Sequence, residues 1–273
     1  MPSSSESRAA VVAVVTAFVL MTALCVPFLL TDHDVPTAVV LAGRYVPALA
    51  SLVAILAVLG RGHLVRLWRL RPASPRELFA SYGLALAVMV PALVAPALAG
   101  LAVGAELKPA GVLLAAVPMI VLGTVLFALS TFGEEVLWRG QLQTALRHLG
   151  FWRSSLLVGV IWMVWHLPLH LTYLSVGALT GEQVVASTLG IAAWAPLLAA
   201  LVERRGTIWP AVLAHAVPLS SLQLLADPSV QGPVPFWTVT VASWVALLVA
   251  ALVVWDRGSA AVPSTVSQTA TSR

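Results

Sequence analysis

Charged residues are scarce in this chain. Only 10% of its 273 residues are Asp, Glu, Lys or Arg, whereas 60% are hydrophobic and the mean hydropathy is +0.96. A soluble domain usually carries about 25% charged residues. This deficit excludes an ordinary water-soluble globular protein. It indicates a polytopic membrane protein, because most of the surface must face something other than water.

Cysteine and lysine are almost absent as well. The single cysteine, Cys25, excludes an intramolecular disulfide framework and a zinc–thiolate cluster, and we interpret it as a small apolar residue within a span. Lys108 is the only lysine among 15 basic residues. The preference for Arg, Ala and Val favours a bacterial source. Most basic residues lie between apolar runs, so they indicate membrane topology rather than a nucleic-acid partner.

The apolar runs are long enough to cross the hydrocarbon layer of a bilayer. We therefore predict an all-α, polytopic transmembrane helix bundle of about eight spans. The predicted limits are 9–30, 36–60, 78–103, 110–132, 154–176, 184–202, 207–226 and 236–255. Residues 1–255 are expected to form a single transmembrane domain. Residues 256–273, rich in Ser, Thr and Ala, are expected to form a disordered cytoplasmic tail.

Arginines concentrate in three of the predicted connections, 61–77, 139–153 and 203–206. These segments hold Arg61, Arg66, Arg69, Arg71, Arg76, Arg139, Arg147, Arg153, Arg204 and Arg205. The alternate connections hold only one Lys or Arg, Lys108. The positive-inside rule therefore predicts that both termini of this multi-pass protein lie in the cytoplasm. Segment 61–77 is expected to be either a basic helix along the membrane surface or a plain loop.

Two adjacent acids stand inside this apolar pattern, in Gly133-Glu-Glu-Val-Leu-Trp-Arg-Gly140. An ionised side chain at the centre of a span costs about 2.5 kcal/mol or more. On an α-helix, Glu135 and Arg139 share one face in the order that favours an ion pair. Glu134 is rotated from Glu135 by about 100°. The spacing therefore predicts that Glu135 pairs with Arg139, while Glu134 is left free to act.

Histidines occur in two of the predicted spans. His166 and His170 lie in the fifth, and His215 lies in the seventh. We expect Glu134, His166 and His215 to meet in the cytoplasmic half of the bundle if their spans are neighbours. His170 is expected either to make only a hydrogen bond between helices or to face the periplasmic half. Arg44, early in the second span, is expected to extend outward toward the membrane surface.

Three motifs carry a resemblance to a known family. Glu134-Glu135-Val-Leu-Trp-Arg139 matches Glu-Glu-x-x-x-Arg, and Trp162-Met-Val-Trp-His166 matches Phe-x-x-x-His with Trp in place of Phe. His215 matches the start of His-x-x-x-Asn/Asp, but Leu219 stands at its last position. With these motifs in this order, the chain resembles the CAAX protease and bacteriocin-processing (CPBP, or ABI) family of intramembrane proteases. The family-like core is 110–226.

This resemblance implies an intramembrane endopeptidase that cuts a membrane-associated protein or peptide, in CAAX-type or bacteriocin-type processing. It implies that Glu134 is the general base that activates a water, and that His166 positions this water. His215 would stabilise the oxyanion, and Glu135 and Arg139 would form the internal ion pair. The expected partners are a membrane-bound substrate and the lipid bilayer, with no nucleic acid.

Two questions stay open at this point. A divalent metal such as zinc, held by Glu134, His166 and His215, would fit the usual count of three protein ligands, and a metal-free glutamate mechanism fits the same residues. The cofactor is therefore unknown, a metal or none. The alternative functions are a non-catalytic membrane scaffold or bacteriocin self-immunity protein, and, further from the motifs, a transporter that uses the intramembrane acids.

Overall fold

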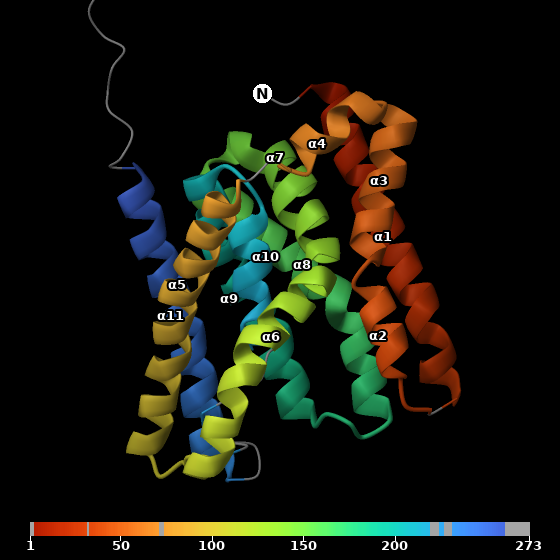
Figure 1. Cartoon of the computed structure of the whole chain (residues 1–273). Coiled ribbons are helices and arrows are strands. Elements are labelled where there is room, and N and C mark those ends of the chain that lie inside the picture. Colours follow the sequence, from red (N-terminus) through yellow and green to blue (C-terminus); the bar gives the residue numbers. More distant parts are fainter. Residues whose placement is uncertain (1–2, 32, 71–73, 219–223, 227–230, 260–273) are drawn as a thin grey trace, which may run out of the picture.

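Helices make up most of the part of the chain that the structure describes. The structure is a computed structural model that describes residues 3–31, 33–70, 74–218, 224–226 and 231–259. The long helices are α1 (Ser4–Thr31), α5 (Pro75–Ala102), α6 (Ala110–Glu135), α8 (Phe151–Ser175), α9 (Gly181–Arg205) and α11 (Pro233–Ser259). The described residues form no strand, so the all-α bundle is confirmed (Figure 1).

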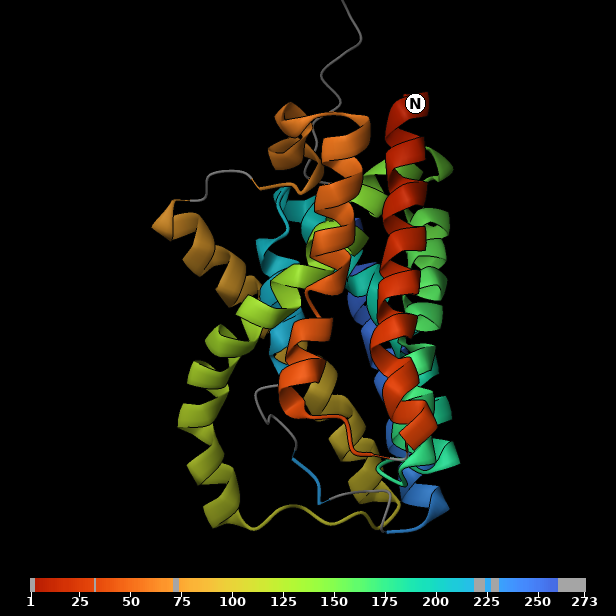
Figure 2. The same ribbon diagram turned by 90° about the vertical axis from the view of Figure 1, so that its right-hand side faces the viewer.

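Shorter helices complete the bundle. They are α2 (Thr37–Gly43), α3 (Val46–Val58), the 3-10 helix η1 (Arg61–His63), α4 (Leu64–Leu67), the π-helix η2 (Val136–Leu142), α7 (Gln143–Leu146), the 3-10 helix η3 (Arg147–Leu149) and α10 (Trp209–Ala216). In segment 61–77, predicted as a basic helix or a loop, residues 61–67 form η1 and α4, and residues 75–77 begin α5. Figure 2 shows η1 and α4 at the end of the bundle where α1 begins.

Six helices or helix pairs in the described residues are long and apolar enough to span a membrane. The helix built from 110–118 and 122–149, bent by 60°, makes a seventh if it is counted as one span. The prediction of about eight is roughly consistent with this number. The difference lies in 207–226, where the described helix α10 has only eight residues. Residues 224–226 nevertheless pair with the loop after α5, through Lys108 N–Leu224 O and Ala226 N–Glu106 O, so they lie at the same end of the bundle as that loop.

Small residues on the inner face of α1 let the helices pack closely. Ala9, Ala13, Ala17 and Cys25 are all buried, whereas large side chains such as Leu30 point outward. Lipid tails are as apolar as the helix surfaces, so the hydrophobic effect does not drive helices together within the bilayer. Close packing of small side chains stabilises such bundles instead. Cys25 therefore packs as a small apolar residue, as predicted.

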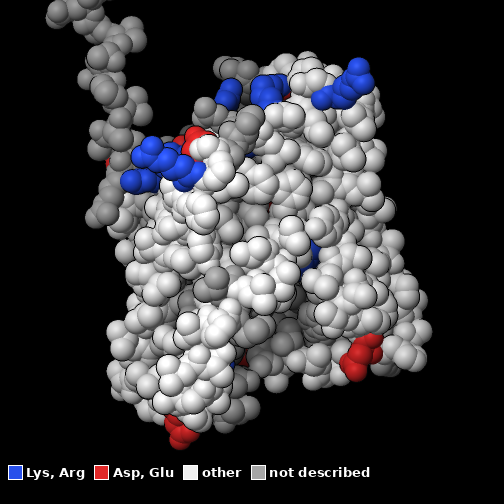
Figure 3. Space-filling model, viewed as in Figure 1, with Lys and Arg blue, Asp and Glu red and all other residues white. Residues whose placement is uncertain are grey.

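Charge is distributed unequally between the two ends of the bundle. On the face shown in Figure 3, most of the Lys and Arg side chains gather at the end where α1 begins, and acidic side chains mark the opposite end. The C-terminal part of α11 lies at the basic end too (Figure 1). The two ends of the helical domain therefore share one end of the bundle, the arrangement that a cytoplasmic location of both termini requires.

The second span is broken between α2 and α3. Pro47, at the start of α3, has no N–H to donate to the Gly43 carbonyl, and its ring would collide with the turn before it. The chain passes the break through a tight turn in which Tyr45 N bonds to Ala42 O at 3.0 Å. The end of α6 packs against this turn, because a Cβ on Gly133 would overlap the carbonyl oxygen of Arg44.

Candidate active site

The two adjacent acids lie at the C-terminal end of α6, inside the bundle. Glu134 is 1% exposed, and Glu135 and Arg139 are fully buried. The chain leaves the α-helical hydrogen-bond pattern directly after them and forms the π-helix η2. Such π-helical turns are rare and often occur at functional sites. Glu134 and Glu135 therefore stand where the helix geometry changes.

Glu135 is the centre of a buried ion-pair cluster. Arg139 Nη1 lies 3.3 Å from Glu135 Oε1, so the ion pair predicted from the spacing is present. His215 Nδ1, from α10, donates to the same oxygen at 2.9 Å. The Arg139 guanidinium also lies 4.1 Å from the ring centroid of Trp162, in a cation–π contact. Glu135 thus orients the ring of His215 and leaves the Nε2 atom of that ring for another partner.

Glu134 has different neighbours on its two carboxylate oxygens. Oε2 accepts a hydrogen bond from Trp162 Nε1 at 2.8 Å and lies 3.8 Å from His166 Nε2. His166 Nδ1 donates to the carbonyl oxygen of Trp162 at 3.0 Å, because a carbonyl can only accept. Nε2 of His166 therefore faces Glu134. A separation of 3.8 Å is too long for a direct hydrogen bond.

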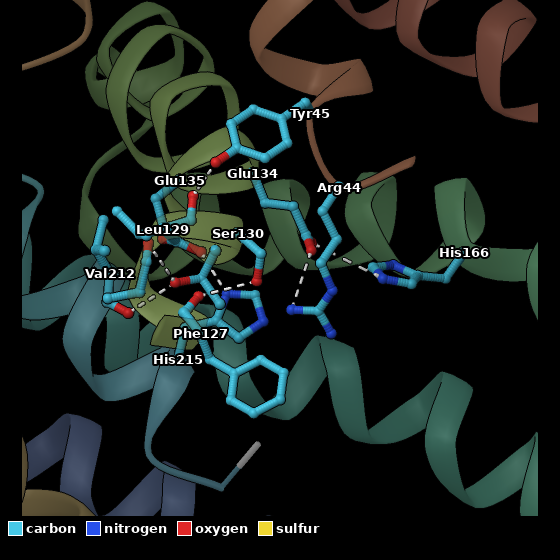
Figure 4. A network of polar contacts seen from close by, with 12 residues as sticks. Arg44, Tyr45, Phe127, Leu129, Ser130, Glu134, Glu135, His166, Val212 and His215 are labelled. Carbon is cyan, nitrogen blue, oxygen red and sulfur yellow. Dashed lines mark hydrogen bonds and ion pairs between the residues drawn. The ribbon is translucent and has the colours of Figure 1, made fainter. Parts of the chain in front are cut away.

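Arg44 lies beside the other oxygen of Glu134, which the sequence did not predict. Its Nη1 is 3.9 Å from Glu134 Oε1, and its side chain is only 20% exposed. The expectation that Arg44 extends outward to the membrane surface is therefore wrong. The break between α2 and α3 turns this residue into the bundle, as Figure 4 shows.

The candidate site therefore draws on four parts of the chain. Glu134 and Glu135 come from α6, His166 from α8, His215 from α10 and Arg44 from the α2–α3 break (Figure 4). The Trp162 ring lies between the two histidines, with ring centroids 5.6 Å from His166 and 5.2 Å from His215. The predicted residues Glu134, His166 and His215 thus gather around one indole ring inside the bundle.

A set of hydrogen bonds fixes the elements that carry the site. Thr131 Oγ1, one turn before the acids, donates to the Val212 carbonyl of α10 at 2.9 Å. Beyond the acids, Gln141 Oε1 accepts from Ser51 Oγ at 2.7 Å, which in turn accepts from Trp68 Nε1 at 2.7 Å. These bonds tie α6 and η2 to α10, α3 and the residue after α4. The end of α6 is therefore held from both sides.

His170 takes no part in this cluster of contacts with the acids. Its Nδ1 bonds to Thr188 Oγ1 of α9 at 2.8 Å. The prediction that it makes a hydrogen bond between helices is confirmed.

Comparison with known families gives one match. Residues 115–218 match the family model described as Rce1-like, Type II CAAX prenyl endopeptidase. The chain carries a CPBP-family domain. A search of the curated proteins found no match. The matched segment includes the acid pair, His166 and His215, and it lies within 110–226. The chain is thus an integral, multi-pass membrane protein whose residues 115–218 form a domain of a family of intramembrane endopeptidases.

Two members of the candidate site were missed in the sequence. Arg44 lies outside the segment that matches the CPBP family, and only Pro47 signals the break that turns it inward. Trp162 was noticed as an aromatic residue of a family motif, but its bond to Glu134 was not foreseen. A phenylalanine at this position would have no N–H to donate. Leu219, at the last position of the third motif, lies outside the described residues.

The side chains of the site were also compared with what a metal ion needs. In the part of the chain that the structure describes, no three His, Cys, Asp or Glu side chains are arranged to hold a metal. The Nδ1 atom of His215 is engaged by Glu135, and that of His166 by a backbone carbonyl. These contacts leave the Nε2 atom of each histidine for another partner, as they would in a metal site, and the steps below use only the side chains themselves.

Proposed function

We propose that this chain is an intramembrane endopeptidase that hydrolyses a peptide bond near the C-terminus of a prenylated, CAAX-type substrate. The observation that carries the proposal is the placement of the Glu134 carboxylate 3.8 Å from His166 Nε2, inside a membrane-spanning bundle. The description of the matching family supports the choice of substrate.

Glu134 and His166 are suited to hold the attacking water between them. One water that makes hydrogen bonds of about 2.8 Å can reach both groups across a gap of this size. In the orientation that follows, it donates one proton to Glu134 Oε2 and the other to His166 Nε2. Its free lone pair then points toward an incoming carbonyl carbon. This arrangement is general base catalysis, with the base within one hydrogen bond of the proton that it removes.

The reaction then proceeds in two steps. Glu134 takes a proton as the water oxygen bonds to the scissile carbonyl carbon, and the carbonyl π electrons move to its oxygen. The resulting oxyanion accepts a hydrogen bond from Nε2–H of His215, the ring whose Nδ1 is held by Glu135. When the intermediate collapses, the C–N bond breaks and Glu134 returns its proton to the leaving amine. The products are a free amine and a carboxylic acid, which releases the remaining water proton to solvent and becomes a carboxylate.

The distribution of charge between the two ends of the bundle suggests how the bundle is oriented in the membrane. We infer that the basic end faces the cytoplasm, by the positive-inside rule. A substrate anchored by a lipid in the cytoplasmic leaflet could then reach the site from that side. The hydrocarbon anchor would stay in the membrane while the peptide enters the bundle.

The test is a cleavage assay with the full chain in liposomes. The substrate is a farnesylated, internally quenched peptide that ends in a CAAX sequence. We expect Glu134→Gln to lower kcat by about 10²- to 10⁴-fold, because the amide cannot take the proton. A thermal unfolding scan shows whether the variant stays folded. The proposal is wrong if the wild-type chain does not cut this peptide, or if folded Glu134→Gln cuts it at the wild-type rate.

A further inference from the structure

Arg44 brings a positive charge into the site for which the steps above give no role. Its Nη1 atom is buried and has no hydrogen-bond partner among the described residues. The nearest carboxylate oxygen, Glu134 Oε1, is 3.9 Å away, beyond hydrogen-bond distance. A buried donor that is left unpaired is unfavourable. An N–H group kept in this state beside a reacting carboxylate is therefore available to a ligand.

The fold fixes the backbone of Arg44 against α6. Gly133 lets α6 approach the Arg44 carbonyl so closely that no larger residue fits without a shift. The next residue, Tyr45, donates its hydroxyl to the Leu129 carbonyl of α6 at 2.5 Å. The backbone at the helix break is thus fixed to the same helix that carries Glu134. The side chains of Arg44 and Glu134 therefore extend from backbone segments that are packed against each other.

The proposed reaction has only one donor so far for the oxyanion, His215. Developing negative charge is stabilised best by several preorganised donors that point at it. Leu219, four residues after His215, has no polar atom to offer. Arg44 is the cationic donor that the described structure places at Glu134.

We propose that Arg44 is a catalytic residue that donates a hydrogen bond to the oxyanion opposite His215. This inference rests on the function proposed above. Glu134 Oε2 faces the water side, toward His166, and Oε1 faces Arg44. A carbonyl carbon attacked by that water lies next to Glu134, so its oxygen can reach Nη1.

The distances argue against a different use of Arg44, as the receptor of a substrate's terminal carboxylate. Each residue of an extended chain spans about 3.4 Å. A carboxylate two or more residues beyond the scissile bond therefore lies about 7 Å or more from the reacting carbon. Arg44 Nη1 lies within 3.9 Å of the catalytic base itself. We therefore assign it to the reacting group rather than to the end of the tail.

The experiment uses the full chain in liposomes, with the same farnesylated peptide and a matching phosphinate. In the phosphinate, a tetrahedral, anionic group replaces the scissile amide and imitates the oxyanion. We expect Arg44→Gln to lower kcat by about 10²- to 10³-fold with little change in KM, since the lost contact exists only in the transition state. The inhibition constant of the phosphinate should rise by a similar factor. Arg66→Gln, which removes an exposed guanidinium paired with Glu6, should change neither.

A second variant protects the test from misfolding. Arg44→Lys keeps the positive charge beside Glu134 but loses the planar N–H fork of the guanidinium, so its activity and phosphinate affinity should lie between those of wild type and Arg44→Gln. If Arg44→Gln does not fold, a comparison of Arg44→Lys with wild type decides: phosphinate binding unchanged overturns the inference, and weakened binding supports it.

The outcomes separate this inference from the proposed function. If folded Glu134→Gln still cuts the peptide, the function itself is wrong. If Glu134→Gln is inactive but Arg44→Gln keeps the wild-type kcat, only the role of Arg44 is wrong. A fall in kcat with an unchanged inhibition constant for the phosphinate also overturns it, because Arg44 would then act through Glu134 and not on the oxyanion.

Discussion

Removing Arg139 should destabilise the protein strongly, because its charge is paired where water cannot reach. The side chains of Arg139 and Glu135 are both 0% exposed, and their closest N–O distance is 3.3 Å. Loss of one partner of a buried pair costs about 3 to 5 kcal/mol, because the other charge stays buried. Arg139→Met also removes the contact over Trp162, worth about 0.5 to 2 kcal/mol. We expect a total of about 4 to 6 kcal/mol.

The assay is thermal unfolding of the purified chain in detergent. For a chain of this size, 1 kcal/mol corresponds to about 2 to 4 °C in Tm, so Arg139→Met should lower Tm by about 8 °C or more. The matched control is Arg66→Met, because the side chain of Arg66 is 53% exposed and its pair with Glu6 should contribute about 1 kcal/mol or less. The double variant Glu135→Gln/Arg139→Met should recover part of the loss. The reasoning is refuted if Arg139→Met and Arg66→Met lower Tm equally.

Three further substitutions test other parts of the site. Trp162→Phe removes the indole donor to a carboxylate, so the free energy of unfolding in a denaturant titration should fall by about 1.5 to 3 kcal/mol; unchanged stability would contradict the bond. His215→Gln should lower kcat for the farnesylated peptide by about 10²-fold or more, and a change confined to KM would argue against an oxyanion role. Gly133→Ala should reduce stability by about 1 to 3 kcal/mol because its Cβ meets the Arg44 carbonyl, whereas Gly83→Ala, which has open space around it, should not reduce it.

The sequence predicted those features that depend on composition and helical spacing. Long apolar runs are sufficient to identify the spanning helices, because hydrocarbon requires about 20 apolar residues in a row. The ion pair of Glu135 with Arg139 follows from their separation along one helix. The meeting of Glu134 with the two histidines was expected from motifs and depended on which helices are neighbours.

Other features depend on contacts between helices, which one sequence does not reveal. The inward direction of Arg44 results from a helix break and from the close approach of Gly133. The bond of His215 to Glu135 depends on how α10 is positioned against α6. The short helix α10 was read as part of a full span because its surroundings are equally apolar. Hydropathy predicts whether a segment lies in the membrane, but it does not predict how that segment is folded there.

The account's central claim is that the water-activating acid and the oxyanion donor line one chamber in the bundle. A structure of the wild-type chain with the phosphinate bound tests this claim most directly. We predict that one phosphinate oxygen lies at hydrogen-bond distance from Nε2 of His215 and another beside the Glu134 carboxylate. A phosphinate bound at a different place, with Glu134 and His215 both free of contact with it, would contradict the account.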